Sequence, residues 1–145
     1  MDCKEVAKEV KTLANLLKRQ LDASISKVST DNITGVQVLI LGFISDSETD
    51  IYQKDIEKQF DIRRSTVTNI LHGMEKQNFI IREAVNNDAR LKKIILTRKA
   101  KDILNNLNDE VTKTQQLLIK DISEHDLEIY FSVIKKMKEN LGGKQ

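Results

Sequence analysis

The spacing of apolar residues predicts a chain made mainly of helices. Near the N-terminus, apolar residues recur every three or four positions, which predicts one amphipathic helix over residues 3–26. The polar stretch 29–32 then offers turn and N-cap chemistry. Residues 34–44 are apolar on nearly every side, so we expect a second helix that lies at the centre of the fold.

A polar loop leads to Ile51 and Tyr52, where we expect a short edge strand. Two further helices are predicted in close succession, over residues 53–60 and 64–77. The second has an apolar stripe, formed by Val67, Ile70, Leu71 and Met74. Its other side is polar and carries Ser65, Thr68, Asn69, His72 and Lys76. A solvated helix more often carries Glu and Lys there, whereas short donors and acceptors suit base edges and phosphates.

Two β-rich runs follow, over residues 79–85 and 88–97, and they predict a hairpin. The tip between them is polar and basic, with Asn86, Asn87, Asp88 and Arg90. A helix followed by a basic hairpin is the arrangement of a winged helix-turn-helix, in which the helix enters the major groove and the hairpin reaches the flanking backbone or minor groove. We therefore expect a mainly α fold with a small β-hairpin wing, whose DNA-binding part spans about residues 34–97.

Two more amphipathic helices are predicted after the hairpin. One is capped by Thr97 and runs to about Lys120, and the other begins near Ser123 and runs to about Leu141. Both ends of the chain thus carry apolar stripes that a small winged-helix core does not need. We expect residues 3–26 and 98–141 to form a dimerisation part in which these helices pack across a twofold axis. Packing within one chain alone is the alternative.

Composition limits the class of protein. The chain has 145 residues, no Pro and 5 Gly, which favours a single domain over residues 1–145 with long uninterrupted helices. No apolar run approaches the roughly 18 residues that cross a bilayer, and the charged N-terminus does not resemble a signal peptide. One Cys excludes an intramolecular disulfide framework. We expect a soluble cytoplasmic protein that does not bind membranes.

The net charge of +2 is unevenly distributed. The segment from Gln53 to Lys101 holds 12 Lys and Arg and 6 Asp and Glu, a charge of +6, which leaves −4 for the remainder. This basic segment also carries the helix and hairpin pattern, so it favours a polyanionic partner. A solvated charged surface is the alternative.

The order of elements and two motifs resemble the MarR family (multiple antibiotic resistance regulators) over nearly the whole chain. The hairpin shows the family's Asp-x-Arg, a basic residue and a strand ending in Leu-Thr, here Asp88-Ala89-Arg90-Leu91-Lys92 and then Ile94-Ile95-Leu96-Thr97. Upstream, residues 62–69 resemble the start of the family's recognition helix with its Ser-Thr-Val core, and residues 34–37 resemble the opening of its second helix. The two motifs together, at this separation, are a strong signal.

The resemblance implies a homodimeric transcriptional regulator, usually a repressor, that binds an inverted repeat of double-stranded DNA. The recognition-helix candidates would face bases or phosphates in the major groove: Ser65, Thr66, Thr68, Asn69 and His72. Arg64 and Lys92 would contact phosphate, and the neighbouring Arg63 is a further DNA-binding candidate. Arg90 would enter the minor groove, where a planar guanidinium suits the negative potential, and Asp88 would hold it in place.

Four positions depart from the family pattern, and one of them is Ala100, which replaces a Gly that often follows Leu-Thr-x-Lys. Asn78 replaces a Gly near the end of the recognition helix and can adopt the same left-handed cap conformation. Arg63 replaces a capping Ser, so either Asp61 caps the helix or the cap is lost. Ala89 stands where a second wing Arg is common, which would weaken contacts in the groove.

The sequence gives no support for catalytic or metal chemistry, so we expect no enzyme, cofactor or metal. It has no Gly-rich phosphate loop and no Ser-His-Asp arrangement, and its two histidines, His72 and His125, lack metal-ligand spacing. Cys3 raises a redox-switch hypothesis, but the neighbouring acidic residues oppose activation of its thiol, so a bystander Cys is favoured. Members of the family often respond to small aromatic acids or phenolics, and no residue here identifies such an effector.

Two functional hypotheses follow. The leading one is a dimeric, sequence-specific DNA-binding transcriptional regulator that a small ligand releases from DNA. The alternative is a winged-helix protein-interaction module without specific DNA binding. The basic segment and the polar helix face argue against the alternative, and a steep salt dependence of binding would separate the two.

Overall fold

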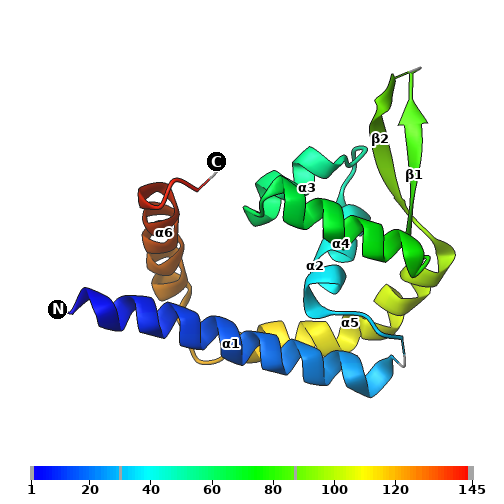
Figure 1. Cartoon of the computed structure of the whole chain (residues 1–145). Coiled ribbons are helices and arrows are strands. Elements are labelled where there is room, and N and C mark those ends of the chain that lie inside the picture. The colour runs from blue at the N-terminus through cyan, green and yellow to red at the C-terminus, as the bar shows by residue number, and fades with distance from the viewer. Residues whose placement is uncertain (1, 30, 87, 144–145) are drawn as a thin grey trace.

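The computed structural model describes residues 2–29, 31–86 and 88–143. These residues form six helices and a two-stranded antiparallel sheet (Figure 1), in the order α1 (Cys3–Val28), α2 (Gly35–Asp46), α3 (Gln53–Phe60), α4 (Arg64–Lys76), β1 (Ile80–Val85), β2 (Asp88–Leu96), α5 (Arg98–Leu118) and α6 (Glu124–Asn140). The predicted fold class is confirmed, and so is each predicted helix, to within about two residues at its ends. Thr30 and Asn87, which fall in predicted turns, lie outside the described residues.

Side-chain caps set where α2, α5 and α6 begin, and Asp2 Oδ1 caps α1 by accepting a hydrogen bond from the Lys4 amide at 2.9 Å. The Thr34 hydroxyl accepts a hydrogen bond from the Gln37 amide at 3.3 Å, and the Gln37 side chain accepts one from the Thr34 amide at 3.1 Å, so a capping box starts α2. Thr97 Oγ1 accepts a hydrogen bond from the Ala100 amide at 3.2 Å and starts α5. Ser123 caps α6 in the same way.

The core is centred on α2, as its apolar sequence predicts. Its residues Ile40 and Leu41 are fully buried. The other elements contribute apolar side chains around them, among which are Ile56, Val67, Leu71, Met74, Phe79, Ile80, Ala100 and Leu107. Ile25 of α1 belongs to the same cluster, so the N-terminal helix packs on the core that positions the recognition elements.

The hairpin of β1 and β2, which we call the wing, projects from this core (Figure 1). Its register pairs Ile80 with Leu96 at the base and Ala84 with Lys92 toward the tip. At the tip, Asn86 has a φ of 49°, a left-handed conformation that Asn tolerates in turns. The wing is thus fixed at its base by buried residues and free at its polar end.

The predicted edge strand at Ile51 and Tyr52 is wrong. The Ile51 carbonyl accepts one hydrogen bond from the Ile94 amide of β2, at 2.8 Å. The Tyr52 amide donates instead to Asp55 Oδ2, at 2.9 Å, within the first turn of α3. Because the Tyr52 amide is bonded within α3, this described segment makes only one backbone hydrogen bond to β2, and no strand forms there.

The terminal helices pack only partly within one chain. α1 lies along α5, and α6 turns away beyond the end of α5 (Figure 1). Between α1 and α5, the hydroxyls of Ser24 and Thr114 form a buried hydrogen bond of 3.1 Å. None of the α6 side chains is buried, and Phe131 is 66% exposed. Exposed apolar residues also line α1, namely Val10, Leu13 and Leu16.

Candidate nucleic-acid interface

The polar face predicted for the recognition helix is the exposed face of α4. Val67, Leu71 and Met74 are fully buried, so the apolar stripe holds α4 on the core. All five recognition-helix candidates are exposed, namely Ser65, Thr66, Thr68, Asn69 and His72. The structure therefore presents short hydrogen-bonding side chains on one side of a rigidly packed helix.

A tight turn joins α3 to α4. Asp61 has a φ of 49° and ends α3, and the next amide, that of Ile62, donates to the Glu57 carbonyl at 3.2 Å. Asp61 therefore does not cap α4, and Arg63 precedes α4 without a capping hydrogen bond from its side chain. The sequence left two alternatives, a cap from Asp61 or a lost cap, and the structure shows the lost cap. Backbone amides in the first turn of α4 are left for an anion such as a phosphate.

Side chains also join the starts of the two helices. Gln53 Nε2 donates to Thr68 Oγ1 at 2.9 Å and lies 3.4 Å from the Arg64 carbonyl oxygen. Thr68 Oγ1 donates to the same carbonyl at 2.9 Å. Gln53 was not among the residues predicted to bind DNA. Its position could have indicated a role at the interface. Gln53 begins the first helix of the helix-turn-helix, and in this class of motif the first helix crosses the DNA backbone.

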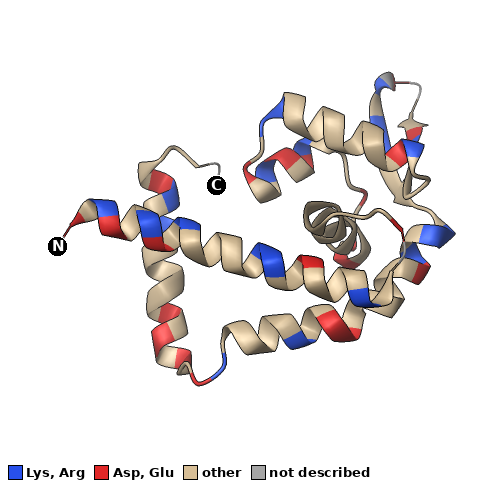
Figure 2. Ribbon diagram, turned by 60° about the horizontal axis from the view of Figure 1, so that its bottom comes forward, with Lys and Arg blue, Asp and Glu red and all other residues tan. Residues whose placement is uncertain are grey.

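A groove of about 340 Å³ lies between the wing and the starts of α3 and α4. It brings together three of the predicted contact residues, Arg64, Arg90 and Lys92. Two further basic side chains, Lys54 and Arg82, line it, and Glu57 is the one acidic residue among its described lining. Lys and Arg lie on both strands of the wing (Figure 2). This excess of positive charge in a concave surface attracts a polyanion.

Asp88 and Arg90 interact at the tip of the wing. The Arg90 amide donates to Asp88 Oδ1 at 3.0 Å, and the guanidinium Nε lies 3.8 Å from the same oxygen. The predicted contact between the two side chains is therefore present. The Arg90 side chain is nevertheless 97% exposed, so its guanidinium is accessible to a ligand.

Arg82 connects the wing to the recognition helix. Its Nε donates to Glu75 Oε1 of α4 at 2.6 Å, and the two side chains form an ion pair. The Arg82 side chain is 23% exposed, which shields the pair partly from solvent. This contact fixes the base of the wing relative to α4. No sequence pattern predicts this ion pair, because the two residues lie on different elements and share no periodicity.

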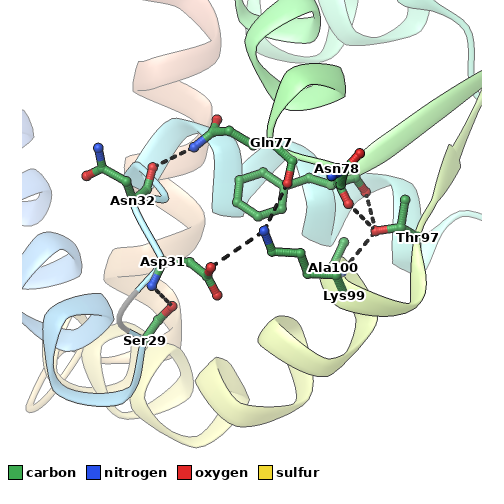
Figure 3. Close-up of polar contacts among 9 residues, drawn as sticks. Ser29, Asp31, Asn32, Gln77, Asn78, Thr97, Lys99 and Ala100 are labelled. Atoms are coloured by element: carbon green, nitrogen blue, oxygen red, sulfur yellow. Dashed lines mark hydrogen bonds and ion pairs between the residues drawn. The ribbon is translucent and has the colours of Figure 1, made fainter.

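The C-terminal end of α4 is held by a polar network (Figure 3). Lys99 Nζ of α5 donates to the Gln77 carbonyl at 3.0 Å and lies 3.6 Å from Asp31 Oδ1. The Gln77 side chain donates to the Asn32 carbonyl at 2.9 Å and accepts a hydrogen bond from Gln37 Nε2 at 3.0 Å. The recognition helix is therefore tied to the loop before α2, to α2 itself and to α5.

Asn78 ends α4 in the left-handed conformation expected of the residue that replaces Gly. Its φ is 60° and its amide donates to the Glu75 carbonyl at 3.0 Å. The Phe79 amide donates to the Met74 carbonyl at 2.9 Å, which completes a Schellman motif. Thr97 Oγ1 donates to the Asn78 carbonyl at 2.6 Å, so the end of α4 meets the start of α5 (Figure 3).

The His, Cys, Asp and Glu residues that the structure describes include no group of three that could hold a metal ion. No helix that the structure describes is both long and apolar enough to cross a membrane. Cys3 is exposed at the start of α1 and forms no disulfide with another described residue.

A short helix, a tight turn, an exposed polar helix and a basic hairpin together define a winged helix-turn-helix protein. The model of the MarR family matches residues 31–91, which span α2, α3, α4 and β1 and reach into β2. The winged helix-turn-helix part of this chain is therefore similar to the MarR family.

Solved structures share the fold of nearly the whole chain. The transcription regulator MarR from Oenococcus oeni PSU-1 is 24% identical, with a TM-score of 0.81 over 92% of this chain and 98% of that chain. MepR from S. aureus, solved in a DNA complex, is 22% identical, with a TM-score of 0.79 over 97% and 98%. The PcaV transcriptional regulator from Streptomyces coelicolor, solved with its natural ligand, is 15% identical, with a TM-score of 0.75 over 96% and 93%.

Proposed function

We propose that this chain is a cytoplasmic, homodimeric and sequence-specific DNA-binding transcriptional regulator, a repressor that a small ligand releases from DNA. The observation that carries the proposal is the groove in which Arg64, Arg90 and Lys92 meet beside the exposed polar face of α4. The DNA complex of the structurally similar MepR supports it.

In this proposal about residues 34–97 bind the DNA, and α4 lies in the major groove. Its exposed side chains face bases or phosphates: Ser65, Thr66, Thr68, Asn69 and His72. The DNA phosphates are bound by Arg63, Arg64 and Lys92. These contacts add affinity but do not distinguish one base sequence from another. Arg90 enters the minor groove, steadied by Asp88.

A second copy of the chain covers the apolar surface of the terminal helices. The proposed dimerisation part comprises residues 3–26 and 98–141. Its exposed apolar side chains include Val10, Leu13, Leu117, Ile122, Tyr130 and Phe131. Such a surface is characteristic of an interface buried in the assembled protein. In the dimer, two recognition helices about 34 Å apart meet successive major grooves of an inverted repeat.

A ligand site between the terminal helices and the winged part accounts for release. A cavity of about 760 Å³ lies between α1 and α2, and its apolar lining includes Leu17, Leu21, Ile25, Val36 and Leu39. Its size and lining suit a small aromatic acid or phenolic. A ligand that binds better to a dimer with the wrong helix spacing shifts the population away from DNA binding. The ligand complex of the structurally similar PcaV supports such a site.

Fluorescence anisotropy with the DNA upstream of the chain's own gene, across a salt series, tests the proposal. We expect nanomolar, sequence-selective binding whose log–log salt slope is about −0.9 per phosphate contact. Arg90→Ala should weaken binding by about 1–3 kcal/mol. Arg98→Ala is the matched control, because Arg98 is also highly exposed and paired with an Asp but does not line the groove.

Equal affinities of the two Arg variants would contradict the role of the wing. Binding that is absent or insensitive to salt in the wild-type chain would overturn the regulator and favour the protein-interaction module. A partner pull-down would then be the next measurement.

A further inference from the structure

Thr68 lies on the exposed face of α4, yet its hydroxyl is already engaged within the protein. It donates its one proton to the Arg64 carbonyl at 2.9 Å and accepts a hydrogen bond from Gln53 Nε2 at 2.9 Å. The direction of both bonds is fixed, because a carbonyl oxygen cannot donate. The Gln53 nitrogen also lies 3.4 Å from that carbonyl, so a reversed amide would place two oxygens against each other.

The engaged hydroxyl limits what Thr68 can read in DNA. With its proton used, it cannot donate to the acceptors of the major groove, which are O6 and N7 of guanine, N7 of adenine and O4 of thymine. The Thr68 hydroxyl oxygen can still accept one hydrogen bond, through its remaining lone pair. The γ-methyl group, by contrast, is free of any polar partner, and a Thr methyl reads the C5-methyl of thymine by apolar contact.

We propose that Thr68 recognises a thymine in the major groove through its γ-methyl group, and that Gln53 is the positioning residue that keeps the Thr68 hydroxyl turned toward the helix. This inference rests on the proposed function and names a specificity determinant within it. The competing interpretation, in which the remaining lone pair accepts from N6 of adenine or N4 of cytosine, predicts no dependence on a thymine methyl. It also predicts that Thr68→Ser keeps the wild-type affinity and that Thr68→Val loses it.

The probe is a duplex that the full-length wild-type chain selects from a random-sequence pool. Each thymine in it is replaced in turn by deoxyuridine, which lacks only the C5-methyl, and affinities are measured by anisotropy. At one thymine in each half-site, we expect the wild type to bind about fourfold more weakly to the deoxyuridine duplex, from the loss of one buried methyl contact. Thr68→Val keeps this preference, because it keeps the methyl, and Thr68→Ser loses it.

The positioning role of Gln53 has its own readout. Gln53→Ala frees one side of the Thr68 hydroxyl, so we expect the ratio of the affinities for the thymine and deoxyuridine duplexes to fall toward one. Lys54→Ala is the matched control, because Lys54 is the next residue of α3 and lines the same groove. It should weaken binding to both duplexes alike and leave the ratio unchanged.

Three results would overturn the inference, once circular dichroism has shown that the variants fold. They are a wild type indifferent to every thymine methyl, a Thr68→Ser variant that keeps the preference, and a Thr68→Val variant that loses it. A pool that yields no preferred sequence would remove the proposed function itself. That outcome appears with the wild-type chain alone, before any variant is made, so the two failures are distinguishable.

Discussion

Replacement of Lys99 by Met is expected to destabilise the fold by about 1–2 kcal/mol. The Lys99 ammonium group donates to the Gln77 carbonyl at 3.0 Å, lies 3.6 Å from Asp31 Oδ1 and lies 5.0 Å from the centre of the Phe79 ring (Figure 3). A hydrogen bond from a charged donor contributes about 1 kcal/mol at this exposure, an exposed ion pair about 0.2–1 kcal/mol and an exposed cation–π contact about 0.5–1 kcal/mol.

These contributions do not add in full, since all three use one ammonium group whose side chain is 44% exposed. Met also retains an unbranched apolar stem that can pack where the Lys stem packs. The expected loss is therefore smaller than the sum of the three terms. It is still larger than the effect of removing a solvated Lys, which is within about 0.5 kcal/mol.

Urea unfolding followed by circular dichroism measures this loss. All variants are compared at one protein concentration, because a dimer's apparent stability depends on it. Lys101→Met is the matched control: Lys101 is exposed on the same helix, and its side chain has no ion pair or hydrogen bond with another described residue. Equal unfolding free energies for the two variants would refute the reasoning. In 1 M salt the difference should shrink by the ion-pair part alone, because the Debye length is then about 3 Å.

Further predictions concern three other positions. Asn78→Ala should cost about 1 kcal/mol in urea unfolding, because Ala is strained at the φ of 60°, whereas Asn78→Gly should leave stability unchanged or raise it. Leu71→Ala removes a fully buried side chain and should cost about 2–5 kcal/mol, measured the same way. Phe131→Glu should give a monomer with unchanged helicity by light scattering and circular dichroism, because Phe131 is 66% exposed in the chain alone; a dimer would contradict the proposed interface.

The elements that the sequence predicted are those whose signal is local. The buried stripe of α4 repeats every three or four residues, and Val67, Leu71 and Met74 are indeed its fully buried members. The start of α5 follows from the Thr97 cap, three residues from the amide that it binds. The left-handed Asn78 follows from the chemistry of one residue.

The contacts that fix the interface lie between residues that are distant in sequence, so no periodic pattern could predict them. Gln53 binds Thr68 from 15 residues away, Lys99 binds the Gln77 carbonyl from 22 residues away, and Ser24 binds Thr114 from 90 residues away. Each of these residues alone resembles an ordinary solvated polar residue. The wrongly predicted edge strand at Ile51 has a related origin. The local sequence is β-type, but the neighbouring Tyr52 amide donates to Asp55 at the start of α3 and is not available to β2.

α5 links the recognition helix mechanically to the terminal helices. Near its start, Thr97 binds the Asn78 carbonyl and Lys99 binds the Gln77 carbonyl, both at the end of α4. Four turns later, the Thr114 hydroxyl meets Ser24 of α1. A 21-residue helix bends little, so in the proposed dimer the packing of α1 on α5 sets the spacing of the two recognition helices. A ligand in the cavity between α1 and α2 would also contact Asn32, which lines that cavity. Because the Asn32 carbonyl accepts a hydrogen bond from the Gln77 side chain, such a ligand could shift the same C-terminal end of α4.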